Sequence, residues 1–193
     1  MKTLRGFSLV ELLVGIAIFS ILAALAAPSF STWILNAKIR TTAESIQTGL
    51  QIARTEAVKR NTTVRFQLIN STDDSCDLST SGPHWVVSMD SAKSKCGTPA
   101  SDTAAPRIIQ LRNGAEGSDS RTTVLAGLSS VVFNGMGRLP ATSAPVAIDV
   151  KNPTSDLCLP GGRVRCLRIE VKSAGQIRMC DPALTTSDSQ GCS

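Results

Sequence analysis

The first part of the chain is apolar over the length of a membrane helix. Residues 12–27 carry no charge and are mostly apolar, and the apolar run reaches back to Phe7 and ends before Pro28. A helix over Phe7–Ala27 would rise about 30 Å at 1.5 Å per residue, which matches the hydrocarbon core of a bilayer. Glu11 is the one charged residue inside this segment. The pattern predicts a membrane-spanning helix with a single carboxylate near its start.

A one-sided helical pattern follows from Ser29 to about Arg60. Its apolar residues recur at spacings of three and four, while most charged residues fall elsewhere. This apolar stripe consists of Ile39, Ala43, Ile46, Leu50, Ala53 and Ala57. The spacing predicts a stalk helix over residues 28–60 whose second half packs on a globular head formed by residues 61–193.

After residue 61 the pattern changes to short β-rich runs separated by Gly, Pro, Asn, Asp and Ser. These runs are Thr63–Leu68, Trp85–Met89, Arg107–Leu111, Thr122–Leu125, Ser130–Phe133, Pro145–Val150, Cys166–Val171 and Gln176–Cys180. The last two read as a hairpin around Ser173–Gly175, and their alternation puts Arg178 and Cys180 on the face toward water. The predicted fold class is α+β, with a long N-terminal hydrophobic helix and an antiparallel β-sheet head.

The head contains six cysteines and one histidine, and their spacing limits the kinds of site that the head can form. No CxxC pair occurs, and His84 is the one histidine, so a tetrahedral zinc site is not expected. Scattered cysteines behind an export or membrane segment indicate disulfides formed in an oxidising compartment. Cys76 and Cys96 are the favoured local pair. The other four are expected to staple the C-terminal end in a pairing that the sequence leaves open: Cys158, Cys166, Cys180 and Cys192.

Three interpretations compete for the N-terminal segment. The basic start and the small residues Ala24–Ala26 fit a secretory signal peptide cleaved after Ala26. The length alone fits a plain membrane anchor. Neither explains Glu11, since a carboxylate at the centre of a membrane helix costs about 2.5 to 3.5 kcal/mol and usually has a partner charge. A cut between Gly6 and Phe7 would create an amine close to Glu11, which favours the third interpretation.

The stretch Gly6-Phe7-Ser8-Leu9-Val10-Glu11-Leu12 resembles the processing site of type IV prepilins and type II secretion pseudopilins. The resemblance implies a leader, Met1–Gly6, that a prepilin peptidase removes at the cytoplasmic face, followed by N-methylation of Phe7. It also implies that Glu11 pairs with the N-terminus of a neighbouring subunit, and that Pro28 corresponds to the helix-kinking proline of many pilins. The expected location is the inner membrane, single-pass, with the head in the periplasm, and a filament of other pilins after assembly.

Segments of the head narrow the resemblance to one branch. Trp85–Asp90 with Cys96, Arg107–Ile109, Val132–Leu139 and the hairpin Arg168–Pro182 resemble successive parts of the GspH/FimT family of minor pilins and pseudopilins. The resemblance implies a pilin fold and a mechanical, non-enzymatic role in starting or capping a type II secretion pseudopilus or a type IV pilus. No catalytic constellation, cofactor motif or metal site stands out, and an enzyme is not expected.

The basic charge is concentrated near the C-terminus. The chain has a formal net charge of +5, and Lys151–Arg178 contains six basic and two acidic residues. Within it, Gly162-Arg163-Val164-Arg165 matches the GRxR motif through which some FimT-type minor pilins bind DNA. Arg163 and Arg165 could contact successive phosphates without reading sequence, with Arg178 as the alternative position of the motif. The competing interpretation is a solvated loop between Cys158 and Cys166.

Overall fold

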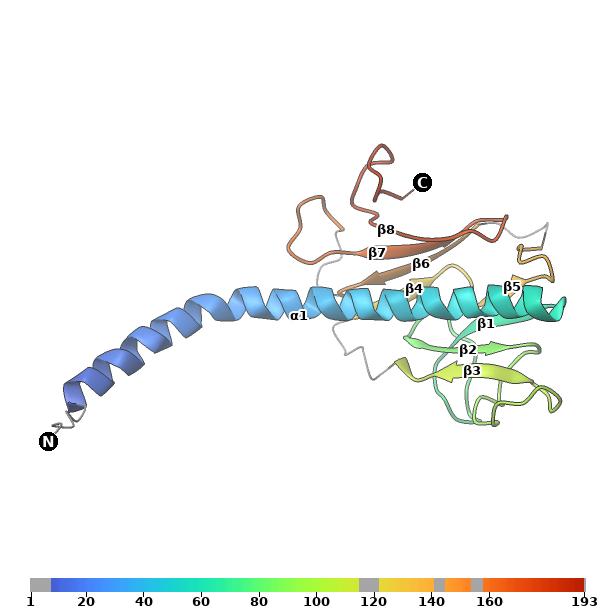
Figure 1. Ribbon diagram of the computed structural model, residues 1–193, viewed down its shortest axis with the longest axis horizontal. Coiled ribbons are helices and arrows are strands. Elements are labelled where there is room, and N and C mark those ends of the chain that lie inside the picture. Colours follow the sequence, from blue (N-terminus) through green and yellow to red (C-terminus); the bar gives the residue numbers. More distant parts are fainter. Residues whose placement is uncertain (1–7, 115–121, 141–144, 154–157, 193) are drawn as a thin grey trace, which may run out of the picture. The chain divides into compact units, whose positions relative to one another are not determined.

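The computed structural model describes residues 8–114, 122–140, 145–153 and 158–192, with only the backbone at 26–28. The predicted leader, Gly6 and Phe7 therefore lie outside the described residues, and of Pro28 only the helical backbone is described. The chain divides into two compact units, Met1–Ile34 and Leu35–Ser193. Helix α1 (Leu9–Arg60) forms most of the first unit and continues into the second, ending where the apolar stripe predicts (Figure 1).

The N-terminal part of α1 has no partner surface within the chain's described residues. Every side chain from Leu9 to Leu25 is exposed, including large apolar ones such as Phe19. No single helix of the described chain is long and apolar enough to cross a membrane. The segments Leu9–Leu25 and Ser29–Arg60 satisfy that requirement, by length and composition, only together as a bent pair.

The eight predicted strands are all present, each within one residue of its predicted bounds. They are β1 (Val64–Ile69), β2 (His84–Ser88), β3 (Ile108–Arg112), β4 (Thr123–Ala126), β5 (Ser130–Phe133), β6 (Val146–Lys151), β7 (Leu167–Val171) and β8 (Ile177–Cys180). The predicted turn between β7 and β8 is confirmed: the Gly175 N–H donates to the Lys172 carbonyl at 2.7 Å, and Gly175 has a φ of 80° that glycine tolerates best.

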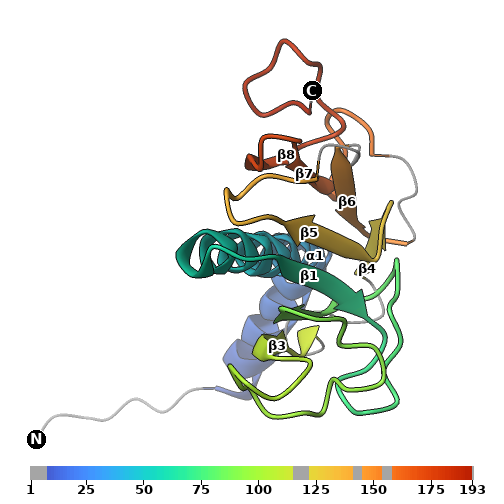
Figure 2. The same ribbon diagram turned by 90° about the vertical axis from the view of Figure 1, so that its right-hand side faces the viewer.

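The strands form two four-stranded sheets rather than one. Their orders are β3-β2-β1-β5 and β4-β6-β7-β8, and every pairing is antiparallel. Strand β4 lies between β3 and β5 in sequence yet pairs with β6 in the other sheet. Both sheets lie beside the C-terminal half of α1 (Figures 1 and 2).

One hydrophobic core joins this half of α1 to both sheets. All six residues of the predicted apolar stripe have 0 % exposure, and they pack with inward residues of both sheets, such as Phe66 and Ile169. Trp85 is the largest fully buried side chain; its indole Nε1 donates to Ser45 Oγ at 3.1 Å, which satisfies its polar atom. The one-sided pattern of the helix is thus explained by a core that the chain itself supplies.

Three disulfides staple the head. Cys76–Cys96 forms as predicted, and the four remaining cysteines pair as Cys158–Cys166 and Cys180–Cys192. The placement of Cys180 on the water-facing side was wrong: it is only 3 % exposed. The alternation of β8 does not account for the C-terminal segment, which returns to bring Cys192 onto Cys180 and covers it.

Candidate functional site

The start of α1 is organised by Ser8 and Glu11. The Ser8 backbone N–H donates to Glu11 Oε2 at 3.2 Å, the Ser8 hydroxyl donates to the same oxygen at 3.3 Å, and the Glu11 N–H donates to Ser8 Oγ at 3.2 Å. This reciprocal pattern is a capping box, in which two helix-end donors are satisfied together. The carboxylate therefore lies at the positive end of the helix dipole, in the first turn of the described helix.

This capping role of Ser8 is absent from the sequence-based predictions, although the signal was available. A serine followed three positions later by a glutamate before an apolar run is the capping-box signature. The Glu11 carboxylate, which suggested a role in assembly, thus also helps to fix where the helix begins.

The loop between Cys158 and Cys166 carries the GRxR motif and is fastened to α1. Asn36 Nδ2 donates to the Arg163 carbonyl at 2.9 Å, and the Arg165 N–H donates to Asn36 Oδ1 at 2.9 Å. Between these two groups, Val164 is half-buried and packs against the hydrophobic core. The side chains of Arg163 and Arg165 are exposed and have no hydrogen-bond or ion-pair partner among the described residues.

Neighbouring arginines are already engaged inside the head. Arg168 binds Asp149 with both its Nε, at 2.7 Å, and its Nη2, at 3.1 Å, and this pairing raises the pKa of the Arg168 guanidinium. Arg178 Nη2 donates to the carbonyls of Ser189 and Gly191, which ties the C-terminal segment to β8. The structure therefore sets Arg163 and Arg165 apart from Arg178, whose guanidinium has a structural role.

A hollow of about 280 Å³ lies beside this loop. One wall is formed by the loop, from Leu159 to Gly162 together with Arg165, and the other by residues of the C-terminal segment, including Asp181 and Gln190. Asp181 is largely buried and its Oδ1 accepts the Ala183 N–H at 2.9 Å. Arg165 is therefore the exposed charge on this hollow.

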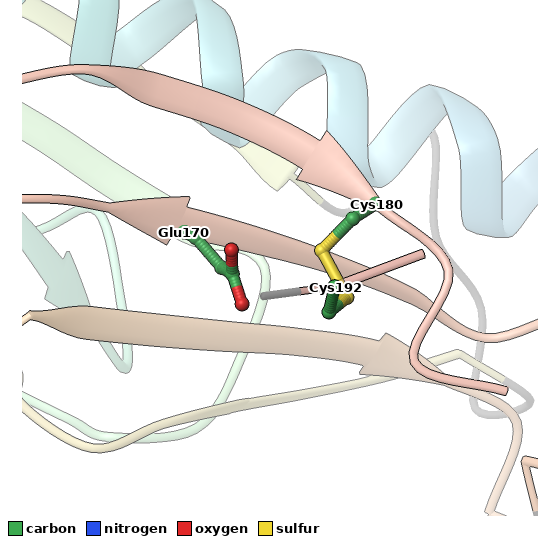
Figure 3. A group of neighbouring side chains, drawn as sticks. All are labelled: Glu170, Cys180 and Cys192. Carbon is green, nitrogen blue, oxygen red and sulfur yellow. A yellow bond between two sulfur atoms is a disulfide. The ribbon is translucent and has the colours of Figure 1, made fainter. Parts of the chain in front are cut away.

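One cluster of potential metal ligands occurs in the described chain: Glu170, Cys180 and Cys192 (Figure 3). Both sulfurs are used in the Cys180–Cys192 disulfide, with an S–S distance of 2.10 Å, so neither is available as a thiolate. His84 Nδ1 accepts the Gly114 N–H at 3.3 Å, a contact to the backbone of a neighbouring segment rather than to a nucleophile. Neither group resembles a catalytic or metal centre.

Comparison with known proteins identifies the family. A model described as the prokaryotic N-terminal methylation motif matches residues 1–27. Two crystal structures of the type IV minor pilin FimU from Pseudomonas aeruginosa are similar at 17 % and 15 % identity, each with a TM-score of 0.48; the matches cover 73 % and 72 % of this chain and 87 % and 90 % of those chains. The model described as type II transport protein GspH matches residues 42–175, more than half of the chain, so the protein belongs to the GspH family of minor pilins and pseudopilins.

Proposed function

We propose that this protein is a non-enzymatic minor subunit of a type II secretion pseudopilus or type IV pilus, acting in its initiating or tip complex. Prepilin peptidase cleaves the chain between Gly6 and Phe7, and Phe7 is then methylated. Before assembly the chain remains in the inner membrane with its head in the periplasm. It then joins the filament through the helix over residues 7–27. The partners are other pilins, the peptidase and the membrane.

The observation that carries this proposal is a contrast in the first part of α1: its side chains are mostly apolar, yet all of them are exposed. Side chains from Leu9 to Leu25 are exposed on every side of the helix, and apolar surface of this extent must be covered by lipid or by other helices. Glu11 provides a reason for assembly. An unpaired carboxylate in the hydrocarbon core raises the free energy of the isolated subunit, so pairing with the amine of an incoming neighbour favours the assembled state.

A test of this assembly role compares Glu11→Ala with two controls in the full-length chain. Glu11→Ala is expected to be processed and inserted normally but to incorporate poorly into filaments, measured by immunoblotting of sheared filament fractions. Ser8→Ala removes the helix cap and keeps the charge, while Glu44→Ala removes an exposed carboxylate elsewhere on α1. Normal incorporation of Glu11→Ala, or an equal defect in Ser8→Ala, would contradict the pairing role.

Deleting the gene for this subunit tests which machine the subunit serves. Loss of exoprotein export supports type II secretion. Loss of twitching, surface pili or DNA uptake supports a type IV pilus.

A second candidate function, contact with DNA during uptake, is favoured by Arg163 and Arg165. Both are exposed and unpartnered among the described residues, unlike Arg168 and Arg178, so their charges are available for phosphates. The test is DNA binding by the double variant Arg163→Ala with Arg165→Ala, with Arg178→Ala for the alternative position. Unchanged affinity and salt slope in the double variant would exclude the motif.

A further inference from the structure

We propose that Asn36 is a positioning residue that holds Arg163 and Arg165 as one preformed site for a phosphodiester backbone. The inference rests on the second candidate function, DNA contact. It adds a residue on α1, more than a hundred positions away in sequence, that determines how the two arginines are presented.

The side chain of Asn36 acts on the loop as a neighbouring peptide group would. Its amide donates to the Arg163 carbonyl and its oxygen accepts the Arg165 N–H, both at 2.9 Å. A donor and an acceptor are required at once, and a carboxamide supplies both. The two bonds fix the backbone on either side of Val164.

Two further contacts hold the same segment. Val164 is half-buried against the hydrophobic core, which directs this side chain inward while its two neighbours remain exposed. The Cys158–Cys166 disulfide closes the loop, and a turn inside it is held by the Gly162 N–H, which donates to the Leu159 carbonyl at 3.1 Å. The backbone that carries both guanidinium groups is therefore ordered before any ligand arrives.

Such order favours binding of a polyanion. A loop that is already fixed loses less conformational entropy when it binds, so more of the arginine–phosphate interaction appears as affinity. Arginine forms strong charge-assisted bonds to phosphate oxygens, and these contacts carry no base specificity. Arg165 also lines the hollow of about 280 Å³ between the loop and the C-terminal segment. A sequence-independent phosphodiester backbone is the ligand that this arrangement fits.

The experiment measures binding of a fluorescein-labelled duplex DNA to the full-length chain in detergent micelles, by fluorescence anisotropy over a range of NaCl concentrations. Asn36→Ala is expected to weaken binding roughly tenfold, with little change in salt slope because both cations remain. The double arginine variant is expected to make the slope of log affinity against log salt concentration shallower by about 2, which corresponds to the loss of two phosphate contacts. Gln51→Ala, an exposed amide on the same helix, is the matched control and should bind as wild type.

A structural readout separates positioning from loss of fold. Asn36→Ala should accelerate hydrogen exchange at the Arg165 amide while leaving the thermal unfolding of the head unchanged. If Asn36→Ala binds DNA as wild type while the double arginine variant does not, the positioning role is wrong and the DNA function stands. If the wild-type chain does not bind DNA, both fall.

Discussion

Helix α1 contains two apolar regions that are covered in different ways. In the N-terminal region, residues 9–25, apolar side chains point in all directions, and Phe19 remains 72 % exposed. In the stripe from Ile39 to Ala57 the apolar residues lie on one face and are fully buried by the two sheets. The stripe is therefore satisfied by the chain itself, whereas the N-terminal region requires lipid or neighbouring subunits. The stripe therefore serves the fold of the head, and the N-terminal region is the part of the helix for which the assembly role is proposed.

The largest expected difference in stability is between two leucine truncations, one in each region. Leu50→Ala leaves a cavity between α1 and the sheets and is expected to lower the free energy of unfolding by about 2 to 5 kcal/mol. Leu13→Ala, at a position 57 % exposed, should leave the unfolding of the head unchanged. Urea unfolding followed by tryptophan fluorescence measures both, and equal shifts in midpoint would contradict the division.

A smaller effect, with a sharper contrast, comes from the same glycine substitution in both regions. A Cβ at Gly49 would lie 2.7 Å from Phe66 Cε2 and 3.1 Å from the Trp85 ring, whereas at Gly15 it would meet nothing within 4 Å. Overpacking costs about 1 to 3 kcal/mol and the gain in helix propensity offsets about 1 kcal/mol.

Gly49→Ala should therefore lower the melting temperature of the head by a few degrees, while Gly15→Ala should not change it. The measurement is thermal unfolding by circular dichroism. Stabilisation by Gly49→Ala would show that the stripe is less tightly packed than the structure indicates.

The smallest effect concerns charge at the end of the stripe. Glu56 accepts hydrogen bonds from Arg60 Nε at 2.7 Å and from Lys59 Nζ at 3.3 Å, and the bond from Arg60 in particular lowers the pKa of the Glu56 carboxyl from its ordinary value of 4.5. Because the folded pKa lies below the unfolded one, this stabilisation is present above pH 4.5 and is lost as the pH falls through the folded pKa.

Glu56→Gln should therefore reduce the acid dependence of stability below pH 4.5, by less than about 1 kcal/mol. Unfolding midpoints measured from pH 3 to pH 7 test the sign. A steeper loss of stability in the variant would contradict the assignment.

Much of the fold could be predicted because its signals are local. The stripe, the end of α1 at Arg60 and the eight strands follow from spacing and from Gly, Pro and Asn breakers, which act over a few residues. The Cys76–Cys96 pair was predictable because its two cysteines, 20 residues apart, lie far in sequence from the other four. Those four lie close together, so proximity alone leaves three possible pairings open.

The remainder depends on contacts between distant segments, which periodicity does not encode. The assignment of β4 to the second sheet and the burial of Cys180 by the returning C-terminal segment are of this kind. So is the bond between Asn36 and the loop: an asparagine on a polar helix face has no distinguishing pattern, and only the folded chain brings it to Arg163. The capping box at Ser8, by contrast, was readable from the sequence.

The N-terminal region is proposed to be a processed assembly helix, and the residue at which the mature chain begins distinguishes this role from that of a cleaved signal peptide. Mass spectrometry of the N-terminal peptide from the membrane-bound protein should show a chain that begins at Phe7 and carries one added methyl group. A mature chain that begins at Ala27, or an intact Met1–Gly6 leader in assembled filaments, would contradict the account.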